Sequence, residues 1–350
     1  MSALFESGLF VGTVPWHHMG NIVPESTRLS VADGVIASGM NWDVYKRNVG
    51  YMSAGQFIVP MDPIFDDDGE QTGEYPRNVY TMRRMLVDGV EQEQTLGIVG
   101  GQYELVQNVD MFKWFQPYLD SGEAYLHTAG SLNDGKWVWV LAKLNREPVE
   151  VAKDDFVEKF LLLSSSHDGS HAVRVGFTPI RVVCANTLAA AHNDKQSKLL
   201  RLRHTKMVHV GLENVHDIVN TVNADFEATA EQFKMLARKG INKADLAKFV
   251  LRVMTGDKVP EDGLSTKMEN IVQSIVERMD SKANALPSIR GTWWAAYNAI
   301  TEHFTWAAGG EGGKIVTPTM KANNRVASLW FGPNSIKNSL ALRIAVEMAA

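Results

Sequence analysis

The spacing of apolar residues changes once along the chain, just after Pro179, and this change most constrains the fold. Before it, segments such as Ala124–Leu132 and Trp137–Leu144 alternate apolar with polar residues, which is typical of strands with one buried face. After it, apolar residues recur every three or four positions, as in His209–Arg238, which predicts amphipathic helices. Strands first and helices later predict an α+β fold: an N-terminal antiparallel sheet with packed helices, followed by an α-helical C-terminal region.

Turn and cap signals give the expected elements. The Asn-Asp-Gly-Lys sequence at 133–136 predicts a hairpin between its two flanking strands, and His167–Ser170 predicts a turn between strands Phe156–Ser165 and Ala172–Phe177. The expected helices are Ser26–Ser38, Asn108–Leu119, Ile180–Ala191, His209–Arg238, Lys243–Met254, Leu264–Met279, Thr292–Trp306 and Ser335–Met348. We therefore expect an α+β domain with a β-hairpin and a basic segment over residues 1–208 and a helical region over 209–350.

Composition excludes several classes of protein. No apolar run approaches the ~18 residues of a transmembrane helix, and the first residues lack the basic region of a secretory signal. The single cysteine, Cys184, excludes an intrachain disulfide framework and is typical of a reducing compartment. We therefore expect a cytoplasmic protein without a membrane partner.

Charge is distributed unevenly. Residues 1–170 carry 12 basic and 24 acidic side chains, whereas residues 171–210 carry seven basic side chains and one acidic, Asp194. The whole chain has a net charge of −5. A short basic segment in an acidic chain suggests a polyanionic partner. The alternative is a solvated surface segment whose charges pair with acidic residues of the first 170.

Nucleic-acid binding is one chemistry that suits this segment. Single strands are held by a positive groove that follows the phosphates and by aromatic faces that stack on the bases. The residues that we expect to bind nucleic acid are Arg174, Arg181, Lys195, Lys198, Arg201, Arg203, His204, Lys206, Phe177 and Tyr103.

A second candidate site is the segment that contains His167, Asp168 and His171, whose side chains are of the types that bind metals or transfer protons. Two histidines four positions apart are neighbours on one face of a helix, but this segment is predicted as strand, turn and strand, and the turn separates them. Asp168-Gly169 is also a common turn dipeptide. The structural turn is therefore the favoured interpretation, and we expect no catalytic residue, resident metal or cofactor.

Several motifs occur together in an order that resembles a known family. They are Pro15–Gly20, Ala37–Val44, Leu96–Tyr103, Ser166–Ser170, Thr178–Leu188, Gly291–Ala299 and Trp330–Gly332. The chain resembles the phage/plasmid-like proteins grouped as domain of unknown function nine-three-two, although His18 stands where that family usually has a glycine. The resemblance implies an accessory protein of phages, prophages or conjugative plasmids that acts in the cytoplasm of a bacterial host. The resemblance assigns no catalytic residue to this chain.

The order strand, strand, helix and hairpin across Val79–Leu144 is similar to single-strand annealing proteins of the RecT, Red-beta and eukaryotic Rad type. This similarity implies a homo-oligomer, with rings among its forms, that binds one strand beside a β-hairpin without ATP. The leading hypothesis is a non-enzymatic protein that binds and anneals single-stranded DNA in phage or plasmid recombination, with a host single-strand-binding protein as a further partner. The alternatives are a protein-interaction or counter-defence module and a metal-dependent hydrolase or nuclease centred on His167, Asp168 and His171.

Overall fold

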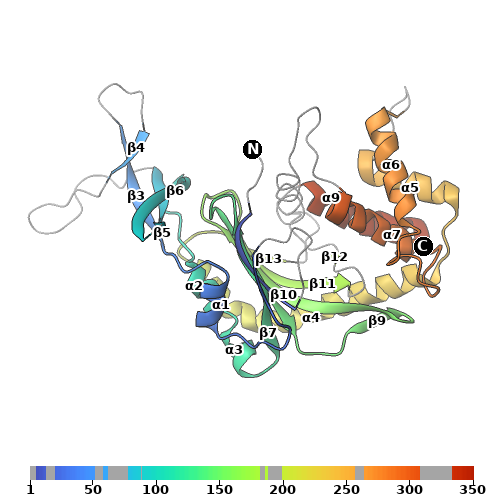
Figure 1. The fold of residues 1–350 in the computed structure, drawn as a ribbon, viewed down its shortest axis with the longest axis horizontal. Helices are drawn as coiled ribbons and strands as arrows, with labels where there is room; N and C mark the ends of the chain where they lie inside the picture. Colours follow the sequence, from blue (N-terminus) through green and yellow to red (C-terminus); the bar gives the residue numbers. More distant parts are fainter. Residues whose placement is uncertain are drawn as a thin grey trace, which may run out of the picture.

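The computed structural model of the protein describes residues 5–12, 20–51, 58–61, 78–87, 89–181, 186–187, 199–256, 264–307 and 333–350. It confirms the predicted α+β class, with strands in the N-terminal part and helices in the C-terminal part. Figure 1 shows a large central sheet, a smaller sheet at one end and a group of helices at the other.

The large sheet is antiparallel except for the pairing of its first two strands, which is parallel. Its order is β12 (Asn186–Thr187), β11 (Val173–Arg181), β10 (Asp155–Ser166), β8 (Trp137–Leu144), β7 (Ala124–Leu132), β1 (Phe5–Val11) and β2 (Asn21–Val23). Two further strands lie beside this path: β13 (Leu200–Leu202) pairs with β11, and β9 (Val149–Ala152) pairs with β10. The hairpin of β7 and β8 has the predicted bounds.

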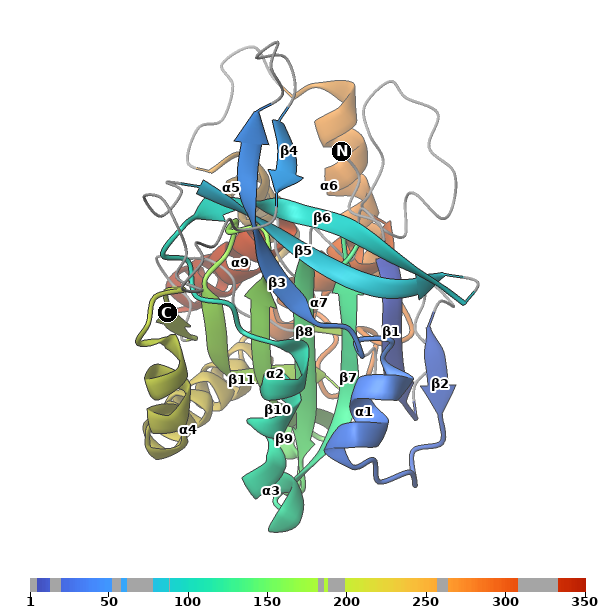
Figure 2. The same cartoon turned by 90° about the vertical axis from the view of Figure 1, so that its left-hand side faces the viewer.

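The smaller sheet has the order β4 (Ile58–Met61), β3 (Val44–Tyr51), β5 (Asn78–Val87) and β6 (Val90–Gly100). Its strands cross the end of the large sheet (Figure 2). We call β5 and β6 the hairpin arm, because their shared turn carries Leu86 and Val90, which are 75% and 61% exposed. The sequence pattern predicted strands from Val79 onward but did not separate a second sheet from the first.

Short helices cover one face of the large sheet. They are α1 (Val31–Ala37), α2 (Asn108–Lys113) and α3 (Gln116–Asp120). Successive side chains of a strand point to opposite faces, so Leu161 and Leu163 of β10 join the core beneath these helices, whereas Phe160 and Leu162 join a smaller core on the other face. Both faces of β10 are therefore buried.

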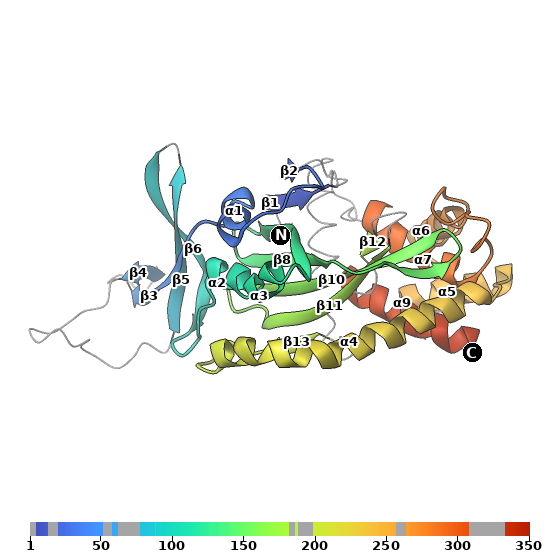
Figure 3. The ribbon, with the colours of Figure 1, turned by 90° about the horizontal axis from the view of Figure 1, so that it is seen from below.

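The C-terminal helices build their own apolar core. They are α4 (Val208–Arg238), α5 (Lys243–Thr255), α6 (Thr266–Arg278), α7 (Trp293–Glu302), its π-helical extension His303–Ala307, and α9 (Pro333–Ala349). Phe233, Trp294 and Tyr297 pack at the centre of this core, which also includes Val151 and Val157 from β9 and β10. Figure 3 shows α4 running along the sheet and on into the helical group. None of the described helices has both the length and the apolar character needed to cross a bilayer.

The predicted helix Ile180–Ala191 is wrong at the residues that the structure describes. Ile180 and Arg181 end strand β11, and Asn186–Thr187 form β12, which pairs with them. Strand β11 continues past Pro179, which lies opposite Lys159 of β10. Cys184 lies outside the described residues.

Candidate nucleic-acid interface

Three of the predicted cations are exposed where β13 leads into α4, a surface that we call the β13–α4 corner (residues 201–210). Arg201 is the central residue of β13 and pairs with Arg174 of β11. The chain then turns, with the Thr205 amide donating to the Arg203 carbonyl at 2.8 Å, and α4 begins at Val208. Arg201, Arg203 and Lys206 are all exposed within six positions of one another.

His204 holds the corner against the sheet. Its ring stacks on Tyr103 with a centroid separation of 4.3 Å, and its backbone carbonyl accepts from the Glu104 amide at 3.0 Å. Its Nδ1 lies 2.9 Å from the Glu104 carbonyl oxygen, which can only accept, so Nδ1 carries the proton. Burial lowers the pKa of His204 below its usual value. A buried, neutral His204 supports the corner rather than contributing charge to it.

Tyr103 is the second part of this support. Its hydroxyl donates to the Ser166 carbonyl at 2.7 Å, and burial raises its pKa. Tyr103 therefore ties the segment after β6 to the end of β10, beneath the exposed cations. It lies in the predicted place, but one face of its ring is already covered by His204.

Two other predicted residues lie inside the protein. Arg174 is only 6% exposed, although its cross-strand neighbour Arg201 is exposed. Phe177 packs beside the core under the helices, and the ammonium of Lys159 lies 4.5 Å from its ring. Arg174 and Phe177 face opposite sides of β11, as their spacing predicts.

Three further predicted residues are not placed by their side chains. Lys195 and Lys198 lie outside the described residues, and for Arg181 only the backbone at the end of β11 is described. The structure thus brings together Tyr103, His204, Arg201, Arg203 and Lys206.

The surroundings of the corner are mixed in charge and polarity. Arg203 and Lys206 have no ion pair among the described residues. The Glu104 carboxylate lies 3.9 Å from the His209 ring at this corner. Met207 and Val210 are 65% and 43% exposed beside these cations. The corner therefore presents positive charge together with accessible apolar surface.

The side chains of His167, Asp168 and His171 have separate partners. His167 is fully buried, and its Nε2 lies 3.0 Å from Oδ1 of Asn108. Asp168 accepts from the amide of Ser170 at 2.9 Å, an arrangement typical of a turn. His171 lies beside the Ser170 hydroxyl, with Nδ1 2.7 Å from Oγ. Within the described part of the chain, no three histidine, cysteine or acidic side chains are arranged to hold a metal ion.

This turn instead packs the two sheets against each other. Gly97 of β6 lies so close to Asp168 that an added Cβ would come within 2.7 Å of the Asp168 Cα. Gly169 likewise approaches Val99 of β6, and its φ of +76° favours glycine. The His167 amide donates to the carbonyl of Lys136 at 2.7 Å. The motif thus has a clear structural role.

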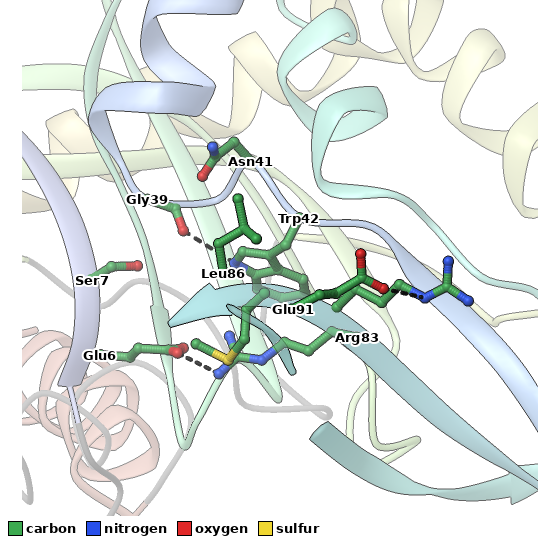
Figure 4. Close-up of a pocket in the computed structure, with 10 residues that line it drawn as sticks. Glu6, Ser7, Gly39, Asn41, Trp42, Arg83, Leu86 and Glu91 are labelled. Carbon is green, nitrogen blue, oxygen red and sulfur yellow. Dashed lines mark hydrogen bonds and ion pairs between the residues drawn. The ribbon is translucent and has the colours of Figure 1, made fainter. Parts of the chain in front are cut away.

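A pocket of about 390 Å³ lies beside the turn end of the hairpin arm, and the sequence patterns did not predict it. Figure 4 shows Arg83 between Glu6 and Trp42 in its wall. Arg83 is 2% exposed, donates to Glu6 and Gln94, and places its guanidinium carbon 4.8 Å from the Trp42 ring. Alternation along β5 gives no signal for this burial, because every position from Val79 to Arg83 is buried and the register shifts between Thr81 and Met82.

This pocket does not extend the basic corner. Its lining includes two arginines, Arg83 and Arg84, and two glutamates, Glu6 and Glu91. Glu6 accepts from Arg83, and Glu91 lies 3.6 Å from Arg84. The pocket is therefore balanced in charge and offers no particular attraction to a polyanion.

Comparison with known proteins identifies one family. No curated protein and no solved structure matches the chain. A family described as a domain of unknown function (DUF932) matches residues 95–330, which include the second half of β6, the β7–β8 hairpin, the His167–Ser170 turn and the β13–α4 corner. Since this match covers about two thirds of the sequence, the chain belongs to the DUF932 family.

Proposed function

We propose that the protein binds single-stranded DNA at the β13–α4 corner and promotes annealing without ATP. The observation that supports this most strongly is the gathering of Arg201, Arg203 and Lys206 at one exposed corner of a chain whose net charge is −5. Guanidinium and ammonium groups bind phosphates and release condensed counterions, which favours association. Arg203 and Lys206 have no carboxylate partner within the described structure, so a phosphate would not compete with an internal ion pair.

The corner offers two kinds of contact to a strand. The cations would neutralise phosphates, and Met207 and Val210 offer apolar surface to the unpaired bases. Contacts to phosphates do not depend on the base sequence. A protein that anneals any two complementary strands requires such sequence-independent contacts. Neutralised phosphates also repel a second strand less, which lowers the barrier to pairing.

An oligomer would strengthen these few contacts. Linked copies bind successive segments of one strand, so that each later contact forms at high effective concentration. The exposed Leu86 and Val90 on the hairpin arm are suitable for contact between copies. We place this activity in the cytoplasm of a bacterial host of phages or plasmids, with a host single-strand-binding protein as a further partner.

A fluorescence-anisotropy titration with a labelled oligothymidylate tests the proposal. We expect the affinity to fall as salt rises, with a slope of about −0.7 in log K against log salt for each phosphate contact. The double variant R203E/K206E should bind more weakly at every salt concentration and should lower the magnitude of the slope by about 1.4, if each residue contacts one phosphate.

K113E is the matched control, because Lys113 on α2 is 64% exposed and lies outside the corner. It should leave both affinity and slope unchanged. The proposal is wrong if the wild-type protein does not bind the oligonucleotide at low salt, or if R203E/K206E and K113E have equal effects.

A further inference from the structure

A second cationic surface lies at the far end of α4, between its last turns and the turn that joins β9 to β10. We call it the cationic hollow, a recess of about 380 Å³ whose charged lining residues are Lys153, Lys234, Arg238 and Glu150. Helix α4 has 31 residues, so at about 1.5 Å per residue the hollow lies roughly 45 Å along the helix from the β13–α4 corner. The two surfaces are therefore separate.

Two elements bring these cations together. Lys234 and Arg238 are four positions apart on α4 and so lie on one face of the helix. Lys153 comes from the turn after β9, and β9 packs on α4 through the core that includes Val151 and Ala230. The hollow exists because a strand and a helix distant in sequence are packed together.

The turn that carries Lys153 is held in place from two sides. The Ser288 hydroxyl donates to the Lys153 carbonyl at 2.6 Å, and the Asp154 amide donates to the Glu150 carboxylate at 3.4 Å. Asp154 has a φ of +65°, which fixes a tight reversal of the chain. A ligand at the hollow would therefore meet a backbone that is already ordered, which reduces the entropic cost of binding.

Three cations and one carboxylate are the charged lining residues of the hollow, and Glu231 interacts with both Lys234 and Arg238. Lys234 pairs with Glu231 at 2.8 Å, and Glu150 is a lining carboxylate. Lys153 and Arg238 are exposed and have no ion pair among the described residues. The negative C-terminal end of the α4 dipole favours Arg238 and other cations close to it. Cationic side chains gathered in this way favour the binding of an anion.

We propose that the cationic hollow is a binding site for phosphate-type oxyanions, whether a free phosphate compound or the phosphates of a nucleic-acid strand. Three cationic side chains arranged around one recess can donate several charge-assisted hydrogen bonds to a tetrahedral anion. A recess of about 380 Å³ also has room for more than one phosphoryl group. This site does not depend on the corner for its charge or its geometry.

Calorimetric titration with inorganic pyrophosphate tests whether the hollow binds a free phosphate compound. The ionic strength is held constant with sodium chloride. We expect saturable binding to the full-length protein and a dissociation constant at least tenfold weaker in K153E/R238E. K153Q/R238Q, which removes charge without reversing it, should weaken binding by a smaller factor. Circular dichroism without pyrophosphate checks that both variants fold, which their exposed positions favour.

The oligothymidylate titration with the same variants tests whether the hollow binds the phosphates of a nucleic-acid strand. Weaker oligonucleotide binding by K153E/R238E would support phosphates of a strand, and weaker pyrophosphate binding alone would support a free phosphate compound. K113E should leave pyrophosphate binding unchanged. Measuring R203E/K206E and K153E/R238E with both probes distinguishes failure of the corner from failure of the hollow. The inference is overturned if K153E/R238E matches K113E with both probes, or if the wild type binds neither.

Discussion

Arg83→Ala is expected to lower the free energy of unfolding by about 3 kcal/mol, the largest effect we predict for a single side chain. Arg83 is 2% exposed and donates to both Glu6 and Gln94. Its removal leaves the Glu6 carboxylate, 22% exposed, without its cation, and it also removes the contact with the Trp42 ring. Urea unfolding followed by tryptophan fluorescence and circular dichroism measures the change.

The neighbouring arginine is a matched control. Arg84 points to the other face of β5, is 57% exposed and contacts Glu91 and Glu93 at the surface. Arg84→Ala should therefore change stability far less than Arg83→Ala. Equal effects of the two substitutions would contradict the structural role assigned to Arg83.

Acid is expected to destabilise the protein steeply below pH 6.5, because several histidines are buried in the neutral form. Burial lowers the pKa of His127 to about 4, of His167 to about 3 and of His303 to about 4. Unfolding exposes them to water, where histidine has a pKa near 6.5, so below that pH the unfolded chain binds protons that the folded chain does not.

The sign and size of the effect follow from this proton uptake. Stability is fully present above pH 6.5 and is lost as the pH falls toward the folded-state values near 4. Each histidine contributes about 1.4 kcal/mol per pH unit in that window, so the three together give roughly 4 kcal/mol per unit near pH 5. Urea unfolding at pH 7, 6 and 5 measures this slope.

Two substitutions separate the buried histidines from general acid effects. His127→Gln removes one titrating group and should reduce the slope by about a third. His209→Gln, at a side chain that is 44% exposed, is the matched control for the substitution itself. A slope below about 1 kcal/mol per pH unit in the wild-type protein would show that these histidines do not control its acid stability.

The sequence predicted much of the fold because many elements have strong local signals. The β7–β8 hairpin was placed to the residue, since Asn133, Asp134 and Gly135 all adopt positive φ in its turn. The bounds of α4 were predicted within one residue, because its apolar stripe is long and its end is marked by Lys239-Gly240.

The errors occurred where pairing between distant segments decides the structure. The predicted helix after Pro179 failed because β10 and β12 hold Ile180 and Arg181 in a strand. The second sheet was not separated from the first. Alternation of apolar and polar residues shows which side chains share a face of a strand, but it does not show which strands pair with each other. The burial of Arg83 has the same origin, since Glu6 is 77 positions away along the chain.

The candidate site was predictable only in part. Clustering of charge along the sequence indicated Arg201, Arg203 and Lys206, which are exposed together at the corner. It could not show that Arg174 is buried or that His204 serves as a support, because both depend on packing around β11 and β6. The cationic hollow had no local signal, since Lys153 and Arg238 meet only through the packing of β9 on α4.

Helix α4 has a consequence for how the protein unfolds. Its first turns carry Val208 and Leu212 into the sheet core, where the Trp114 indole donates to the Leu212 carbonyl at 2.8 Å. Its last turns carry Phe233 and Leu236 into the helical core. Since one continuous element belongs to both cores, neither can open without fraying the other. Amide hydrogens at both ends of the molecule should therefore exchange through a shared cooperative opening.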